Sequence, residues 1–141
     1  DVLTQLTESC KRTYGLKSPH TGCAASNLGL ALDGLQRYAE AVKVGKEALD
    51  ICIAVWGPTG INTLKTKCNL ARALFGNDEP EEAATIGTDA LETCIEVLGE
   101  DHPLTKKTEA ELEIVESMLE QTTGGYTEAE MDEMFSASAN A

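Results

Sequence analysis

A tandem repeat of 42 residues organises this sequence. Moving residues 56–97 back by 42 positions onto residues 14–55 gives 15 identical pairs, where roughly three are expected by chance at ordinary composition. One copy is too short to bury its own apolar face, so neighbouring copies stack and share a continuous core. The repeat therefore predicts an extended array whose working part is a curved surface rather than a catalytic cleft.

The composition and the spacing of apolar residues favour helices. Aromatic residues make up only 4% of the chain, while Ala, Leu, Glu and Gly are common, which suits closely packed helices better than strands. Apolar residues at helical spacing and capping signals predict helices over residues 2–14, 18–33, 38–55, 61–75, 81–98, 104–121 and 126–137. We therefore predict an all-α chain of about six or seven helices in antiparallel pairs.

The 42-residue register also predicts how the chain is divided. We expect the second helix of a partial repeat, two full repeats, a degenerate capping repeat and a frayed tail, at residues 1–14, 15–56, 57–98, 99–137 and 138–141. Because the chain begins at Asp1 in the middle of a repeat, we expect it to be a piece of a longer protein. The helix at 104–121 has a strongly acidic face, which suits an end exposed to water, and the helix at 126–137 is expected to cap the array.

Several residues predict local structure. Ser18 and Pro19 form a good helix start, since Ser can cap free N–H groups and Pro suits the first helical position. Gly34 is placed to end its helix in the left-handed conformation. Glycine within a helix costs about 1 kcal/mol relative to alanine, so its recurrence at Gly45 and Gly87 predicts close approach of a neighbouring helix.

The net charge excludes some classes of partner. At −13, the chain is a poor candidate for neutralising nucleic-acid phosphates or for docking on an anionic membrane. No apolar run approaches the ~20 residues needed to span a bilayer, and the N-terminus lacks the features of a signal peptide. These observations predict a soluble cytoplasmic protein.

The five cysteines do not form a recognisable metal or disulfide motif. Their number is odd and no C-x-x-C pair occurs. Cys10, Cys52 and Cys94 are separated by 42 residues each, so they are interpreted as small buried apolar residues, one in each copy. The alternative, redox sensing by one exposed thiol, would require a lowered pKa.

Small residues at fixed offsets resemble the tetratricopeptide repeat. The first copy of the pattern is Leu28, Gly29, Leu32, Tyr38, Ala41, Ala48 and Leu49, and the second is Leu70, Ala71, Leu74, Pro80, Ala83, Ala90 and Leu91. The 42-residue period, the pairs Asn27-Leu28 and Asn69-Leu70 and the segments at 98–103 and 125–130 resemble the longer repeats of kinesin light chains. HEAT and armadillo repeats have a similar period but lack this placement of small residues.

The resemblance implies a right-handed α-solenoid in which the first helix of each pair lines a concave groove. Carried over position by position, it places there Asn27, Leu30, Lys65, Asn69, Arg72, Phe75 and Lys107, with Cys23, Ser26, Asp33, Cys68, Ala110, Glu111 and Ile114. Lys65, Asn69 and Arg72 share one helical face, which predicts a locally basic groove. Cys23 and Glu111 depart from the carboxylate clamp of chaperone-binding members, so a receptor for chaperone tails is not expected.

We expect the groove to bind an extended segment that contains acidic residues. Asn27 and Asn69 would hold its backbone, because an amide side chain both donates and accepts hydrogen bonds, and Lys65, Arg72 and Lys107 would bind its carboxylates. The alternative interpretation of these residues is an ordinary solvated surface with no ligand.

A second possible function is self-association through the two ends of the array. We expect apolar residues to be exposed there, with Val2, Leu3 and Leu6 at one end and Met134 and Phe135 at the other as the candidate patches. An enzyme is not expected, and we predict no catalytic residue, metal site or cofactor, because no nucleophile–base, phosphate-loop or metal-ligand motif is present. His20 and His102 both flank prolines, where a cap or turn role is the ordinary explanation.

Overall fold

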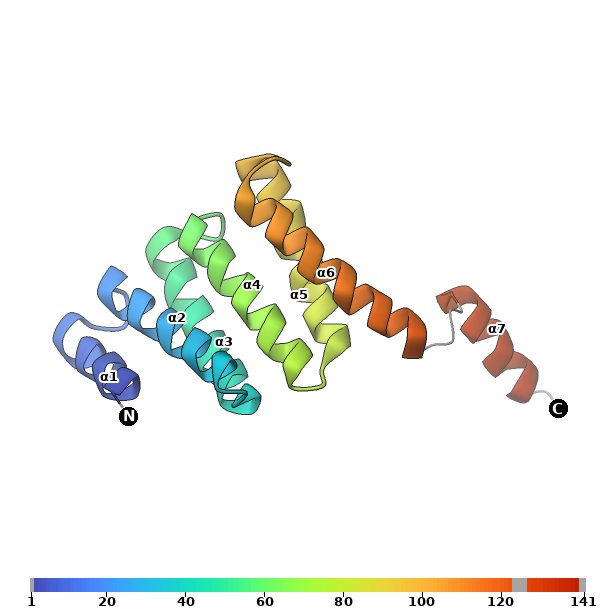
Figure 1. Ribbon diagram of the computed structural model, residues 1–141, viewed down its shortest axis with the longest axis horizontal. Coiled ribbons are helices and arrows are strands. Elements are labelled where there is room, and N and C mark those ends of the chain that lie inside the picture. The colour runs from blue at the N-terminus through green and yellow to red at the C-terminus, as the bar shows by residue number, and fades with distance from the viewer. Residues whose placement is uncertain (1, 123–126, 140–141) are drawn as a thin grey trace.

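The computed structural model describes residues 2–122 and 127–139, and every regular element in these ranges is an α-helix (Figure 1). The helices are α1 Val2–Tyr14, α2 Pro19–Gly34, α3 Tyr38–Trp56, α4 Ile61–Gly76, α5 Pro80–Leu98, α6 Pro103–Thr122 and α7 Glu128–Ala139. The predicted all-α solenoid is confirmed, and the helix bounds agree with prediction to within two residues. The predicted break at 123–125, the helix start at Tyr126 and residues 140–141 lie outside the described ranges.

Successive helices pack against each other from α1 to α6. In addition, α2 contacts α4, and α4 contacts α6. A continuous core joins them, and its buried members recur 42 residues apart, as in the pairs Leu28/Leu70, Leu32/Leu74 and Ala41/Ala83. Each copy of the repeat thus completes its core with side chains of the next, as the stacking of repeats requires.

The array ends at α6, and the prediction that the last helix caps it is wrong. Within the described residues, α7 packs against none of the other helices, and Figure 1 shows it apart from the stack. The physical reason is the outer face of α6. Leu64 and Leu74 of α4 are fully buried, whereas the residues 42 positions later, Lys106 and Glu116, are exposed. That face of α6 therefore lacks the two leucines that α4 buries against its neighbours.

Glycines in α3 and α5 allow the close approach that their recurrence predicted. A Cβ atom on Gly45 would lie 3.1 Å from Leu70 Cδ1, and one on Gly87 would lie 3.1 Å from Leu112 Cδ1. Both glycines are buried. The first helix of each following pair therefore packs its leucine directly on the glycine backbone.

The helix ends agree with prediction at Ser18 but not at Gly34. Ser18 Oγ accepts a hydrogen bond from the His20 backbone N–H at 3.2 Å, as predicted. The left-handed residue after α2 is Gln36, with φ of 60°, and the equivalent residue after α4 is Asp78, with φ of 62°. Gly34 stays helical, so the predicted left-handed conformation at that position is wrong.

Buried threonines hold the connector before each first helix. Thr21 Oγ1 donates to the Gly15 carbonyl at 2.6 Å, and Thr63 Oγ1 donates to the Gly57 carbonyl at 2.7 Å. Thr105 occupies the same position in the third copy and is equally buried, but its hydroxyl has no hydrogen-bond partner among the described residues. The threonine at this repeat position thus makes a side-chain hydrogen bond in the first two copies and none to a described residue in the third.

This difference predicts opposite effects of one substitution. Thr63→Val should lower the free energy of unfolding by about 1 kcal/mol, since it removes a buried hydrogen bond. Thr105→Val should leave it unchanged or raise it, because valine has nearly the same shape and the lost hydroxyl was unsatisfied. Urea denaturation followed by circular dichroism measures both variants. Equal losses at the two positions would contradict the assignment.

Candidate functional site

The helices α2, α4 and α6 form one side of the array, here called the inner face. They contact one another in sequence, whereas α3 and α5, which are both fully described, make no contact with each other. Helices on the inner side of a curved stack lie closer together than those on its outer side. The side chains of α2, α4 and α6 therefore line the concave side.

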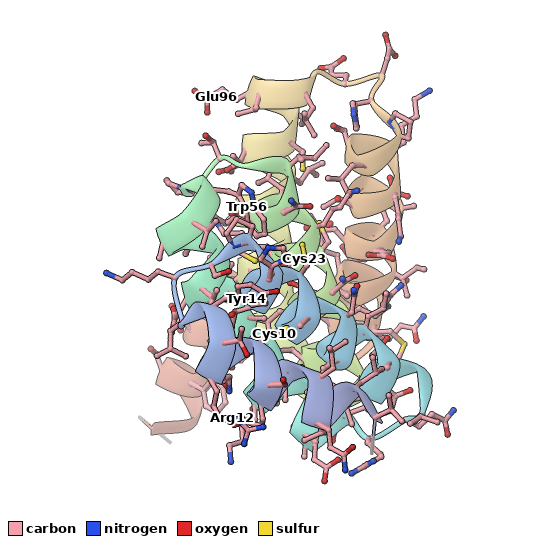
Figure 2. All side chains as sticks on the ribbon, turned by 90° about the vertical axis from the view of Figure 1, so that its left-hand side faces the viewer. Cys10, Arg12, Tyr14, Cys23, Trp56 and Glu96 are labelled. Carbon is pink, nitrogen blue, oxygen red and sulfur yellow. The ribbon has the colours of Figure 1, made fainter. Side chains whose placement is uncertain are left out.

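A first depression on this face, the Asn hollow, lies between α2 and α4 and has a volume of about 240 Å³. Its lining contains six of the predicted groove residues, Cys23, Ser26, Asn27, Leu30, Lys65 and Asn69, and also Trp56, Asn62 and Thr66. Figure 2 looks along the array from the α1 end and labels two of these residues, Cys23 and Trp56. The two asparagines thus face one common depression.

A second depression, the Lys hollow, lies between α4 and α6 and has a volume of about 440 Å³. It shares Leu30, Lys65 and Asn69 with the Asn hollow and adds Lys107 of α6, so the two depressions are continuous. Both lysines are exposed, and neither ammonium group has an ion-pair partner among the described residues. Their positive charge is therefore available to a ligand.

The sequence did not predict that connector residues also line these depressions. Trp56 ends α3 beside the Asn hollow, and His102 and Pro103 border the Lys hollow. They lie before or at the start of the first helices, where helical periodicity carries no signal. The predicted cap role of His102 is confirmed, since its Nδ1 accepts from the Leu104 backbone N–H at 3.1 Å.

The third depression, the apolar hollow, lies among α4, α5 and α6 and has a volume of about 210 Å³. Phe75 and Ile114 line it together with small residues, including Ala71 and Gly87. The equivalent space one repeat earlier encloses only about 10 Å³. There, Asp33 and Arg72 occupy the positions of Phe75 and Ile114, and an ion pair joins them across α2 and α4.

Arg72 forms ion pairs with two carboxylates of the protein. The prediction that it makes the centre of the groove basic is therefore wrong. Its Nε lies 3.1 Å from Asp33 Oδ2, and its Nη1 donates to Glu111 Oε1 at 3.4 Å. Its Nη2 donates to Asn69 Oδ1 at 3.3 Å. One guanidinium therefore joins α2, α4 and α6, and two carboxylates neutralise it. Among the described residues that line the Asn and Lys hollows, Lys65 and Lys107 are the lysines, and neither has an ion-pair partner.

Hydroxyl and thiol groups meet inside the stack in a repeated cluster that the sequence interpretation missed. Thr66 Oγ1 lies 2.9 Å from Ser26 Oγ and 3.4 Å from Cys52 Sγ, and the serine and cysteine are 3.6 Å apart. The residues 42 positions later are Thr108, Cys68 and Cys94. Cys52 and Cys94 are fully buried, as predicted, while Cys10 is partly exposed. The predicted apolar role is incomplete, because these thiols contact hydroxyl groups.

Other classes of site are absent from the described part of the chain. No group of three or more His, Cys, Asp or Glu side chains is placed there to hold a metal ion. None of the described helices is long and apolar enough to cross a membrane. His20 lies against Tyr14, with ring centroids 4.3 Å apart, in the connector between α1 and α2.

Comparison with known proteins identifies the repeat. The model of the family described as tetratricopeptide repeat matches residues 24–59 and 63–104, which is more than half of the chain. No curated protein matches the chain significantly. The two matched segments cover most of the helices that form the inner face, α2 and α4, and the beginning of α6. The chain therefore belongs to the tetratricopeptide repeat family.

Proposed function

We propose that this chain is a protein-binding module that holds an extended acidic segment of its partner on the inner face. One arrangement carries the proposal: Lys65 and Lys107 border the same hollow as Asn69, and no carboxylate is paired to either lysine within the described residues. A chain with a net charge of −13 repels acidic partners overall. Two unpaired ammonium groups beside one hollow are therefore the local feature that attracts a carboxylate.

The other inner-face residues have distinct roles in this proposal. The amides of Asn27 and Asn69 bind the backbone of the segment, which has unpaired donors and acceptors when extended. Arg72 acts indirectly: it holds Asn69 Oδ1, which leaves the Asn69 amide hydrogens directed to the ligand. Leu30 contributes apolar contact between the Asn and Lys hollows. Phe75 lines the apolar hollow, whose volume of about 210 Å³ admits an apolar side chain of the segment.

Membership of the family supports the general class of function. Tetratricopeptide repeats generally mediate protein–protein interactions. We further propose that these repeats are of the kinesin light chain type, from the 42-residue period and the two Asn-Leu pairs. A cytoplasmic location is part of the same proposal. The net charge of −13 supports the further proposal that the partner is neither a nucleic acid nor an anionic membrane.

Reversing the two lysines tests the proposal. Lys65→Glu/Lys107→Glu should weaken binding of acidic peptides by at least about tenfold, because two favourable charge contacts become repulsive. Fluorescence anisotropy with labelled acidic peptides, and with basic peptides of equal length, measures the change. The acidic peptides should also bind less tightly at high salt, since the lysines are exposed.

The matched control carries the same change of charge outside the Asn and Lys hollows. Lys43→Glu/Lys106→Glu reverses two exposed lysines that line neither the Asn hollow nor the Lys hollow. This variant should bind acidic peptides with nearly wild-type affinity. Equal affinity of the wild type and the Lys65→Glu/Lys107→Glu variant, or equal losses in both variants, would refute a site on the inner face.

Exposed apolar residues at the ends support a second candidate, self-association. Val2 and Leu6 of α1 are 78% and 50% exposed, and Met134 and Phe135 of α7 are 53% and 75% exposed. In Figure 2, α1 lies at the near end of the array with no helix in front of it. Static light scattering over a range of concentrations distinguishes an assembly built on these ends from a monomeric receptor.

A further inference from the structure

Two cysteine thiols and one hydroxyl meet where α4, α5 and α6 join. Cys68 Sγ of α4 lies 3.0 Å from Thr108 Oγ1 of α6. Cys94 of α5 is fully buried. Cys68 and Cys94 lie 42 residues after Ser26 and Cys52, whose Oγ and Sγ atoms are 3.6 Å apart in the preceding cluster. Cys94 contacts both Thr108 and Cys68, so the second cluster is a copy of the first in which the serine–cysteine contact has become a contact between two thiols.

We propose that Cys68 and Cys94 form a redox-active dithiol, which hydrogen peroxide converts into a disulfide between α4 and α5. The Cys68 thiolate attacks one peroxide oxygen; the O–O bond breaks, and the leaving oxygen departs as water after protonation. The sulfenic acid formed on Cys68 is then attacked by Cys94, the S–O bond breaks, and a second water leaves. Two thiols are oxidised and one hydrogen peroxide is reduced to two waters.

The surroundings favour Cys68 as the thiol that reacts first. Cys68 lines both the apolar hollow and the Lys hollow, which open a route for a small oxidant, whereas Cys94 lines neither. Burial raises the pKa of Cys68 to about 11, despite the opposing hydrogen bond to Thr108. Burial likewise raises the pKa of Cys94, although contacts with Thr108 and Cys68 oppose it. Little thiolate exists at neutral pH, so the reaction is slow there and faster at alkaline pH.

The disulfide would alter the inner face. It would link the two helices that, with α6, enclose the apolar hollow, and it would remove the Cys68 S–H group that can donate to Thr108. Oxidation therefore changes both the rigidity of the α4–α5 pair and its contact with α6. This inference rests on the thiol cluster alone and does not depend on the proposed peptide ligand.

Peptide mapping of the full chain tests the inference directly. The protein is treated with hydrogen peroxide at several pH values, its remaining thiols are alkylated, and the digest is analysed by mass spectrometry without reduction. We expect a cross-linked pair of peptides containing Cys68 and Cys94, lighter by two hydrogen atoms than the two thiols. Its rate of formation should rise by about tenfold per pH unit below the pKa of Cys68. Cys68 and Cys94 recovered as alkylated thiols, or Cys68 recovered only as a sulfinic acid, would overturn the inference.

The two clusters provide matched variants in opposite directions. Cys68→Ser copies the first cluster into the second, so it should fold normally and lose the cross-link. Ser26→Cys copies the second cluster into the first, so it should gain a second cross-link between positions 26 and 52. Circular dichroism and thermal melting of each reduced variant show that it is folded. Failure of the folded Ser26→Cys variant to form the second cross-link would also count against the geometry.

Discussion

Leu74→Ala is expected to lower the free energy of unfolding by about 3 kcal/mol, which is the usual loss for a leucine removed from a rigid core. Leu74 is fully buried, with 0% of its surface exposed to solvent. It belongs to the core that runs from α2 to α6. Since each copy of the repeat shares this core with the next, the cavity weakens the contacts of α4 with its neighbours on both sides. Urea denaturation followed by circular dichroism measures the loss.

The same chemical change at an exposed leucine provides the control. Leu35 follows α2 and is 65% exposed, so Leu35→Ala should change the free energy of unfolding by no more than about 0.5 kcal/mol. If Leu74→Ala were as mild as Leu35→Ala, the continuous core would not be the main source of stability in this array.

The helices were predictable from sequence because each of them is repeated. A 42-residue period with apolar residues on one helical face specifies which residues are buried, and the buried pairs Leu28/Leu70 and Leu32/Leu74 follow it. The glycine pair Gly45/Gly87 likewise predicted a packing contact that the structure contains. Features that recur in every copy depend on local geometry and on the stacking of identical units, and both can be inferred from the sequence.

The errors occur where the role of a residue depends on contacts that the repeat pattern does not specify. Gly34 resembled a left-handed helix end, yet the chain reverses at Gln36. The equivalent Gly76 has a different role, because a Cβ atom there would lie 2.5 Å from the ring of Tyr38. Tyr38 belongs to the start of α3, so the glycine is required by packing between copies and not by the turn.

The candidate site was predictable as a set of positions but not as a distribution of charge. The family resemblance placed Asn27, Lys65, Asn69 and Lys107 on one face, and the structure arranges them around two continuous hollows. Whether a cation on that face has an ion-pair partner depends on side chains of other helices that are distant in the sequence. Arg72 is neutralised by residues of α2 and α6, and this pairing has no signature in the period or spacing.

Arg72→Met is expected to lower the free energy of unfolding by about 2 kcal/mol, because it leaves a largely buried carboxylate without its cation. The side chain of Asp33 is only 12% exposed, and that of Arg72 is 34% exposed. Methionine keeps much of the apolar volume of the arginine stem, so most of the loss should come from charge. Denaturation of the two single variants and the double variant Asp33→Asn/Arg72→Met measures the coupling, which should be at least about 1 kcal/mol.

A surface ion pair of similar length shows how much of this effect comes from burial. Lys46 Nζ lies 3.3 Å from Glu82 Oε1, but these side chains are 53% and 45% exposed. Lys46→Met should therefore cost no more than about 0.5 kcal/mol, since exposed pairs contribute little. If Arg72→Met lowered the free energy of unfolding as little as Lys46→Met, the charge of Arg72 would be available to a ligand, like those of Lys65 and Lys107. It would then be expected to bind acidic peptides directly, and Arg72→Met would weaken that binding without affecting stability.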